Sequence, residues 1–251
     1  MAGALVEAWA ERSEVSAVLE ARGVEVSRGR SPVLRGVSLS LHAGRVTGLL
    51  GPTGAGKTTL FEVLVGERTP ERGSVWLLGA EVTRKPLWRR ARMGVGYIPQ
   101  TPSVLPDLDV RGNLVSFERL VGGEGKGAVY WADLVGLGHR MNVRAGSLSG
   151  GERRLLEVAR SLVVRPRVLI CDEPFSGIDP VGAMRVAETL RSRAGEGLAV
   201  LLSDHHASIA LRVCDEAGLL LDGRLEVWGT PAELMSDGLV RERYLGGSMD
   251  G

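Results

Sequence analysis

The feature that most constrains the fold of this chain is a glycine-rich octapeptide between an aliphatic run and a helical pattern. The octapeptide, Gly51-Pro52-Thr53-Gly54-Ala55-Gly56-Lys57-Thr58, has the spacing of a phosphate-binding loop. Its glycines let successive backbone N–H groups surround phosphate oxygens, and the start of the following helix adds a partial positive charge. A strand, this loop and a helix in that order predict an α/β fold that binds a nucleoside triphosphate.

Two side chains of the loop carry most of the expected chemistry. Lys57 can reach the β- and γ-phosphates of ATP, and the Thr58 hydroxyl can ligate Mg²⁺. All but three of the 31 basic residues are arginines, so a lysine at this position agrees with a demand for a compact phosphate ligand. The alternative is a glycine-rich turn that matches by chance. We expect the segment from Gly51 to Thr59 to bind ATP.

A pair of carboxylates follows a second aliphatic run, Val168–Cys171. Such a run suits the middle of a parallel sheet, where both faces of a strand are covered. At the end of this strand Asp172 can hold Mg²⁺ through water, and Glu173 can orient or deprotonate an attacking water. An isolated pair of this kind is more often a charged turn. Together with the phosphate loop it predicts hydrolysis of the nucleotide, and Cys171 is expected to be a buried strand residue rather than a reactive thiol.

Aliphatic runs and helical patterns alternate through most of the chain, which is typical of an α/β core around a largely parallel sheet. The expected strands are Arg45–Leu50, Val95–Ile98, Val168–Cys171, Leu198–Ser203 and Ala217–Leu221. The expected helices are Thr58–Val65, Arg153–Val163, Pro180–Arg193 and His206–Val213. Shorter β-rich runs in the first 40 residues and in Gly73–Val82 predict a flanking antiparallel β-subdomain.

Interruptions of this alternation predict the domain organisation. Residues from about 107 to 162 have a helical pattern with a glycine-rich break at Gly122–Gly127, and we expect them to form an inserted α-helical subdomain. The subdomain belongs to one ATPase domain that spans residues 17–251. Residues 1–16 are expected to form a loosely attached extension, or a short helix that binds a partner through Leu5 and Trp9.

Composition argues against several classes of protein. A net charge of +1 is not typical of a protein that binds duplex DNA through its phosphates, so no nucleic-acid partner is expected. The longest uncharged stretch, Met93–Pro106, is broken by glycines and prolines and does not suit a membrane span. Glu7 and Glu11 near the N-terminus, without a basic start, argue against a secretory signal. With only two cysteines in the chain, a cytoplasmic location is expected.

A third motif, Leu148-Ser149-Gly150-Gly151-Glu152, offers a hydroxyl, backbone N–H groups and a helix start to an anion. Alone it would be an ordinary helix N-cap. It ends 20 residues before Asp172 and resembles the signature of ATP-binding-cassette (ABC) ATPases. Further family elements lie along the chain in the order usual for the family. Gln100, before the signature, is similar to the Q-loop glutamine. After the signature, Asp179 lies in a segment like the D-loop, and His205 resembles the switch histidine. The resemblance extends from about residue 19 to residue 245.

The resemblance implies a mechanism shared between two chains. Gln100 would contact the metal ion and the attacking water, and His205 would bond the γ-phosphate beside Glu173. The choice of His205 over the adjacent His206 rests on alignment alone. The residues implied to complete the ATP site of a second protomer are Ser149, Gly150, Gly151 and Asp179. A homodimer attached to transmembrane permease subunits, peripheral on the cytoplasmic face of the inner membrane, is therefore implied.

Within this family, four segments resemble the ATP-binding subunits of lipopolysaccharide exporters: Pro86–Gln100, Leu148–Leu162, Asp172–Pro180 and Val240–Gly246. The ATPases of branched-chain amino-acid importers share a similar tail and length and are the alternative. A soluble family member of DNA repair or translation would normally show duplicated cassettes, coiled-coil insertions or basic arms. A scaffold without turnover would be expected to lack Glu173 or His205, and both are present.

Two details depart from the family pattern or extend it. The family usually places an aromatic residue before the phosphate loop, where adenine stacks, but Val24–Ser31 contains none. Counting back from Val37 places Arg28 at this position, and because a guanidinium can stack on a base, we expect ATP to bind with weaker base selectivity. The expected docking surface for membrane subunits is the loop after Gln100, with Val104, Leu105 and Leu108. The alternative is that these apolar side chains pack inside the helical subdomain.

Overall fold

The computed structural model describes residues 16–204 and 207–245, and its centre is a six-stranded sheet. The strands stand in the order β10-β9-β3-β8-β7-β6. The parallel strands are β3 (Val46–Leu50), β6 (Val95–Ile98), β7 (Val168–Asp172), β8 (Ala199–Ser203) and β9 (Glu216–Leu221), and β10 (Arg224–Gly229) joins β9 antiparallel. The predicted largely parallel sheet is confirmed, with the ends of its five expected strands shifted by at most 1 residue.

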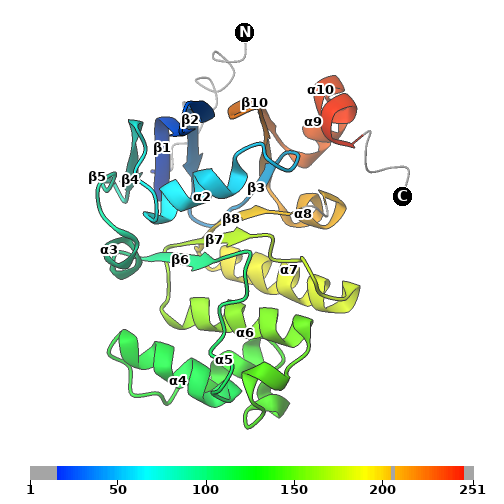
Figure 1. The fold of residues 1–251 in the computed structure, drawn as a ribbon. Helices are drawn as coiled ribbons and strands as arrows, with labels where there is room; N and C mark the ends of the chain where they lie inside the picture. The colour runs from blue at the N-terminus through cyan, green and yellow to red at the C-terminus, as the bar shows by residue number, and fades with distance from the viewer. Residues whose placement is uncertain (1–15, 205–206, 246–251) are drawn as a thin grey trace.

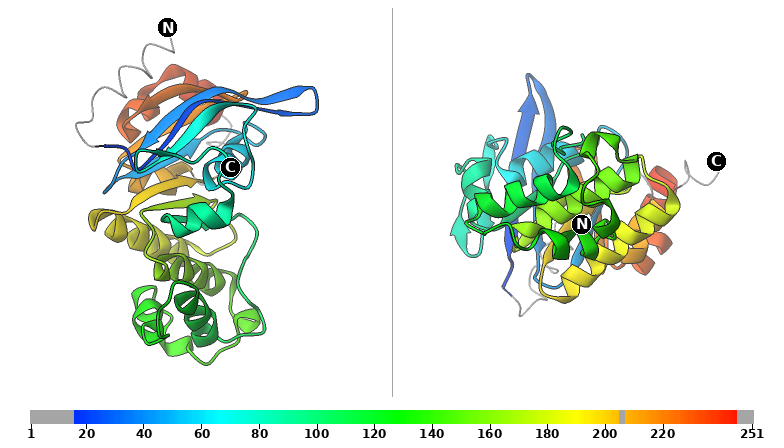
Figure 2. Two further views of the ribbon diagram at one scale, coloured as in Figure 1. Left: turned by 90° about the vertical axis from the view of Figure 1, so that its left-hand side faces the viewer. Right: turned by 90° about the horizontal axis from the view of Figure 1, so that it is seen from below.

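A second sheet, entirely antiparallel, lies over one face of the first. Its order is β2-β1-β4-β5, with strands β1 (Leu19–Arg28), β2 (Ser31–Leu41), β4 (Arg72–Leu77) and β5 (Ala80–Glu81). Helix α2 (Lys57–Val65) runs beside it in the upper half of the molecule (Figures 1 and 2). Leu60, Phe61 and Leu64 of this helix share a buried core with side chains of both sheets. The helix that begins at the phosphate loop is therefore fixed from two sides.

Helices that share a second core cover the other face of the central sheet. Helices α6 (Gly150–Val163) and α7 (Pro180–Gly195) lie against its strands, and α4 (Val110–Leu120) and α5 (Ala128–Leu134) pack on α6. Helices α4 and α5 occupy the lower end of the molecule in Figure 1, together with the 3₁₀ turns η1 (Gly138–Arg140) and η2 (Ala145–Ser147). Figure 1 shows the result, an elongated chain with a β-rich end and a helical end.

Shorter helices complete the described chain. They are α3 (Leu87–Arg92), α8 (Ala207–Val213), α9 (Pro231–Ser236), α10 (Gly238–Val240) and the π-helical turn η3 (Arg241–Leu245). Helix α6 begins at Gly150 instead of the expected Arg153, because a capping box between Ser149 and Glu152 starts the helix earlier. Residues 1–15, which hold most of the expected extension, lie outside the described residues. No described helix combines the length and the apolar character that a membrane span requires.

Arg90 of α3 fixes the far end of the helix that follows the phosphate loop. Its side chain is fully buried and donates hydrogen bonds to the carbonyls of Val63 and Leu64 at 2.7 and 2.8 Å. Further bonds reach the carbonyls of Lys85 at 2.9 Å and Thr83 at 3.0 Å. Burial lowers the guanidinium pKa to about 10. Since the last carbonyls of a helix lack partners within the helix, Arg90 satisfies them and stabilises the position of α2.

Candidate functional site

The phosphate loop is packed between the two sheets, and two of its glycines are required there. Gly51 has φ +148°, and a Cβ atom at this position would overlap the carbonyl oxygen of Leu220 in β9. Gly56 has φ +108°, and its Cβ would lie 2.9 Å from the side chain of Leu34 in β2. Both backbone conformations favour glycine. The loop therefore has one fixed position, at the carboxyl end of β3 and the start of α2.

Lys57 lies within this loop with only 7% of its surface exposed. Its ammonium donates to the carbonyl of Gly51 at 2.5 Å and to the carbonyl of Pro52 at 3.0 Å. Burial lowers the pKa of the amine, and the carboxylates of Glu173 and Asp172 oppose that effect. The backbone oxygens of the loop therefore hold the Lys57 ammonium close enough to Glu173 and Asp172 for their charges to act on it.

A cavity of about 500 Å³ opens around the loop. The lining residues from the expected ATP site are Arg28, Thr53, Gly54, Gly56, Lys57, Thr58, Thr59, Gln100 and Glu173. Ser31 and Val33 of β2 also line the cavity, and the sequence analysis did not identify them. Within the described chain, Ser149, Gly150, Gly151 and Asp179 are not among the lining residues of this cavity. The second anion-binding motif therefore does not face the phosphate loop of its own chain.

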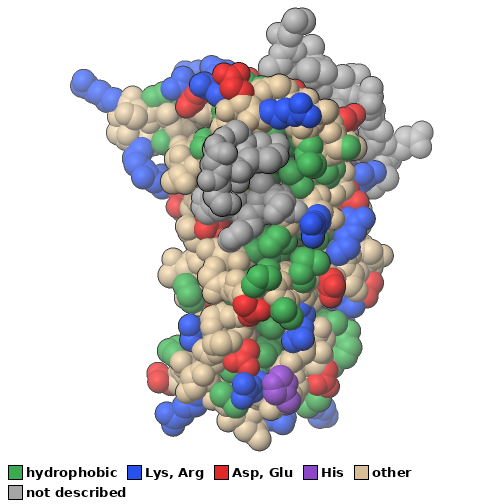
Figure 3. All heavy atoms as spheres, turned by 90° about the vertical axis from the view of Figure 1, so that its right-hand side faces the viewer, with side chains coloured by type: hydrophobic (Ala, Val, Ile, Leu, Met, Phe, Trp, Pro, Cys, Tyr) green, Lys and Arg blue, Asp and Glu red, His purple; other side chains and the backbone are tan. Residues whose placement is uncertain are grey.

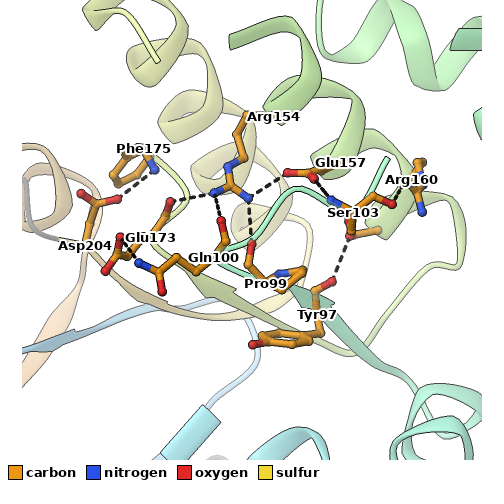
Figure 4. Close-up of polar contacts among 11 residues, drawn as sticks. Tyr97, Pro99, Gln100, Ser103, Arg154, Glu157, Arg160, Glu173, Phe175 and Asp204 are labelled. Carbon is orange, nitrogen blue, oxygen red and sulfur yellow. Dashed lines mark hydrogen bonds and ion pairs between the residues drawn. The ribbon is translucent and has the colours of Figure 1, made fainter. Parts of the chain in front are cut away.

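Glu173 is held in a sparsely populated backbone conformation at the end of β7. Its φ is +52°, a left-handed value that costs a non-glycine residue about 1–2 kcal/mol. Its backbone N–H donates to the Ser203 carbonyl at 2.8 Å, and its carboxylate accepts from the Gln100 amide at 2.9 Å. These bonds bring the expected base and the expected Q-loop glutamine together (Figure 4).

Asp172 offers a buried oxygen that fits a divalent cation. Its Oδ1 accepts from the Ser203 hydroxyl at 2.8 Å, whereas its Oδ2 has no hydrogen-bond partner among the described residues. Only 1% of the residue is exposed. An unsatisfied buried carboxylate oxygen is costly, and Mg²⁺ prefers oxygen ligands of this kind. The neighbouring Cys171 is fully buried, as expected, and burial raises its pKa to about 12, so it stays a thiol at neutral pH.

A row of charged residues on one face of α6 ties the Q-loop to Glu173 (Figure 4). Arg154 donates to the carbonyls of Pro99 at 3.0 Å, Gln100 at 3.4 Å and Glu173 at 3.1 Å. It also forms a buried ion pair with Glu157 at 2.8 Å. A single arginine thus holds the backbone of both Gln100 and Glu173, whose side chains are hydrogen-bonded to each other.

The same face of α6 continues along the loop after Gln100. The Glu157 carboxylate accepts a hydrogen bond from the Ser103 N–H, and Arg160 donates to the Ser103 carbonyl at 2.7 Å. The sequence analysis missed these contacts. The one available signal was the three-residue spacing of Arg154, Glu157 and Arg160, which places them on one side of a helix. The same spacing is usual for a solvent-exposed face.

The start of α6 combines a helix cap with a potential anion site. The Ser149 hydroxyl accepts from the Glu152 N–H at 3.2 Å, so its own hydrogen can still be donated to a ligand. The Ser149 N–H is already used, because it donates to the Glu152 carboxylate at 2.9 Å. That carboxylate accepts from Arg140 at 2.7 Å, and its pKa is lowered, mainly by the Ser149 backbone bond. Rearrangement of Glu152 would release one further donor.

The D-loop segment lies directly against this helix start. A Cβ atom at Gly150 would lie 2.8 Å from the Gly177 carbonyl oxygen, so the two backbones touch. Asp179 caps α7 by accepting from the N–H groups of Val181 and Gly182, each at 3.0 Å. The hydrogen bond from Gly182 is the main cause that lowers the pKa of this exposed carboxylate. The signature and D-loop residues therefore form one surface, separate from the phosphate cavity.

Two other expected sites have mixed outcomes. His205 lies outside the described residues, but Asp204 before it accepts from the Phe175 N–H at 2.8 Å. In the expected docking loop, Val104 is partly buried and packs against the core cluster that includes the helices, in agreement with the alternative for this residue. Docking of the loop to membrane subunits stays a prediction. Leu105 and Leu108 remain 40% and 38% exposed. The loop is anchored because fully buried Asn113 exchanges hydrogen bonds with the Leu105 backbone at 2.9 and 3.0 Å.

Comparisons with known proteins agree with this geometry. The family model described as "ABC transporter" matches residues 34–176. The chain is 39% identical to the lipopolysaccharide export system ATP-binding protein LptB of Acidithiobacillus ferridurans, over 92% of this chain and 98% of that protein. It is 35% identical to LptB of Escherichia coli K12, with the same coverage of both chains. An uncharacterized ABC transporter ATP-binding protein of Rhizobium meliloti is 36% identical, over 94% of this chain and 89% of that protein.

Solved structures show the same fold. The ADP conformation of MJ1267, an ATP-binding cassette of an ABC transporter, superposes with a TM-score of 0.84 at 26% identity. The superposition covers 92% of this chain and 99% of that chain. The dimeric post-hydrolysis state of the ATP-binding cassette MJ0796, bound to ADP and phosphate, has a TM-score of 0.76 at 22% identity, covering 85% of this chain and 98% of that one.

Replacing Arg154 and Glu157 together by methionine is expected to lower kcat for ATP about 10- to 100-fold, because the Glu173 carbonyl and the Q-loop lose their shared donor. The double change removes a buried ion pair without leaving either charge alone, so the fold should persist. The KM for ATP should stay within about threefold, since Lys57 and its loop are untouched. Steady-state ATPase kinetics measure both constants, and exposed Arg119→Met is the control. An unchanged kcat in the double variant would contradict the positioning role of Arg154 and Glu157.

Proposed function

Because the chain belongs to the ABC transporter family, we propose that it is the ATP-hydrolysing subunit of a lipopolysaccharide exporter. Family membership follows from the match over residues 34–176 and from relatives that align over 92% of the chain. Members of this family bind and hydrolyse ATP, and this chain has their fold. The export role is supported by its 39% and 35% identity to two LptB proteins. Those identities favour export over the branched-chain amino-acid importer.

The observation that supports a composite, two-chain ATP site is the position of the signature motif. Ser149, Gly150 and Gly151 lie beside the D-loop and away from the phosphate cavity of their own chain. A second copy that faces the first can bring these donors to the γ-phosphate of ATP bound at Lys57. The surface next to Asp179 suits such a contact, because Val181 is 70% exposed and Met184 is 38% exposed on α7. Figure 3 views the molecule from the right-hand side of Figure 1 and shows apolar side chains gathered near the middle of that face.

In the proposed reaction, Lys57 exchanges the carbonyls of Gly51 and Pro52 for phosphate oxygens when ATP binds. Glu173, steadied by Gln100, accepts a proton from the water that attacks the γ-phosphorus, and ADP and phosphate leave. His205 is proposed to bond the γ-phosphate beside this water.

Mg²⁺ would neutralise the developing charge on the phosphates. Thr58, Gln100 and the unsatisfied oxygen of Asp172 are proposed to hold it, directly or through water.

Residues from about 107 to 162 are proposed to act as a helical subdomain within one ATPase domain that spans residues 17–251.

A groove of about 520 Å³ lies along α3, α4 and α6. Trp88, Leu120 and Val121 line it and are 51%, 77% and 55% exposed. Buried Arg160 also lines the groove, and its Nε has no hydrogen-bond partner among the described residues. We propose that a transmembrane subunit docks here with an apolar helix that carries an acidic side chain, on the cytoplasmic face of the inner membrane.

Glu173→Gln is expected to trap an ATP-bound dimer, because the amide keeps the shape of the side chain but cannot take the proton of the attacking water. Turnover should fall at least about 100-fold. Light scattering after gel filtration, at saturating ATP and Mg²⁺, should give the mass of two chains. The double variant Lys57→Ala, Glu173→Gln should stay monomeric. A monomeric single variant would contradict the composite site.

Arg28→Ala is expected to weaken ATP binding about tenfold, because the cavity wall would lose the guanidinium proposed to stack on the base. The ratio of ATP to GTP affinity should move toward one. Binding of both nucleotides can be measured calorimetrically, with exposed Arg30→Ala in the adjacent turn as the matched control. Unchanged affinities would remove Arg28 from the site.

Co-purification from detergent-solubilised membranes tests the export role. Membrane subunits with periplasmic β-rich domains are expected, whereas compact permeases with a soluble binding protein would indicate import. Leu120→Glu should abolish the co-purification and leave the ATPase activity of the isolated chain unchanged. Leu78→Glu, at an exposed position outside the groove, is the control. Retention of the membrane subunits by Leu120→Glu would reject the groove as the docking site.

A further inference from the structure

A second cavity, separate from the ATP site, lies between the two sheets. Its volume is about 190 Å³, and residues of β1, β2, β9 and β10 line it. It shares no lining residue with the phosphate cavity. This volume is well above the roughly 10–15 Å³ that one water molecule needs. The space is therefore large enough for a small organic molecule.

The floor of this cavity carries an unsatisfied carboxylate. Glu216 at the start of β9 is only 1% exposed. Its Oε1 accepts from the Thr47 hydroxyl at 3.2 Å, while its Oε2 has no hydrogen-bond partner among the described residues. Burial raises the pKa of this carboxyl, and the Thr47 hydroxyl, the charge of Arg45 and the indole of Trp228 oppose that rise. A buried acceptor without a donor costs roughly 1–3 kcal/mol, and a charged one more. A ligand that donates a hydrogen bond to Oε2 would remove this cost.

The walls of the cavity are apolar and aromatic. Leu39, Leu225 and the indole of Trp228 line it. Trp228 lies directly over β9, since a Cβ atom at Gly218 would overlap its ring. An aromatic ring beside a buried carboxylate is a combination that binds organic cations, through the ring face and a charge-assisted hydrogen bond.

The two basic residues that line the cavity are engaged elsewhere or uncharged, whereas exposed Arg45 lies outside the lining and acts on Glu216 through its charge. Arg22 pairs with Glu20 at 2.8 Å and lies over the Trp76 ring at 4.6 Å. His42 is half-buried, and burial followed by the charge of Arg45 lowers its pKa, which leaves the imidazole neutral at neutral pH. The unsatisfied oxygen of Glu216 is therefore not matched by a cation from the lining of its own cavity.

We propose that this cavity binds a small organic cation, with an ammonium or guanidinium group at Glu216 and an apolar body against Trp228. The bound cation would bridge the outer sheet and the β9–β10 edge of the central sheet. The site is independent of ATP chemistry, because its lining contains no residue of the nucleotide site.

Titration calorimetry with isoamylamine, and with isoamyl alcohol as the uncharged probe of the same shape, tests the proposal. The amine should bind the full chain saturably and at least about tenfold more tightly than the alcohol. Glu216→Gln should lower the amine affinity at least about tenfold, because the charge at the floor is lost. Exposed Glu188→Gln on α7 is the matched control and should bind the amine like the unmodified chain.

A second variant keeps the test independent of changes at Glu216. Ser40→Leu narrows the cavity from β2 without altering Glu216, and it should also abolish amine binding. Circular dichroism and thermal melting show whether each variant is folded. Equal binding of amine and alcohol, or amine binding that survives Glu216→Gln, would overturn the proposal. Absence of saturable amine binding to the unmodified chain would also overturn it and leave a water-filled cavity.

Discussion

The tight packing of the phosphate loop between the two sheets is the constraint on which the rest of the site depends. Gly51 touches β9 of the central sheet, and Gly56 touches β2 of the outer sheet. Neither contact leaves room for a Cβ atom, so a shift of either sheet would move the loop. The cavity wall at Arg28 comes from the outer sheet, and Glu173 comes from the carboxyl end of β7. The phosphate loop, packed between the two sheets, thus sets the distance between Arg28, the residue expected to stack on the base, and Glu173, the expected catalytic carboxylate.

Helix α6 gives the site a second organising element, because it serves two purposes along its length. Its 14 residues span roughly 20 Å. Its N-cap is Ser149, which we propose faces a partner chain, and its buried face holds the Glu173 carbonyl through Arg154. A rigid helix connects the two ends. Movement of the signature end during closure of a dimer would therefore be transmitted to the backbone of the proposed catalytic carboxylate, Glu173, in the same chain.

The central sheet and the phosphate loop could be predicted from the sequence because long aliphatic runs and glycine spacing report directly on buried strands and tight turns. The α6 contacts could not, because Arg154, Glu157 and Arg160 have the spacing of an exposed polar face. Only the folded chain brings the backbone of Pro99 to Ser103 against them and makes that face buried. Ser31 and Val33 were missed for a similar reason, since β-pairing with β1 places them at the cavity and nothing in their chemistry indicates a nucleotide. The packing of Val104 could not be predicted, because a short apolar run suits a docking surface and a core equally.

The same three side chains connect the proposed docking groove to the proposed catalytic carboxylate, Glu173. Arg160 lines the groove and holds the Ser103 carbonyl, Glu157 holds the Ser103 N–H, and Arg154 links Glu157 to the Glu173 carbonyl. Each link is a charge-assisted contact in a buried region, where such bonds are strong and an unpaired charge is costly. A partner that supplies an acidic group to Arg160 would weaken its hold on Ser103, and the neighbouring bonds would have to adjust. The left-handed conformation of Glu173, which needs its surroundings to persist, is the point where that adjustment would alter catalysis.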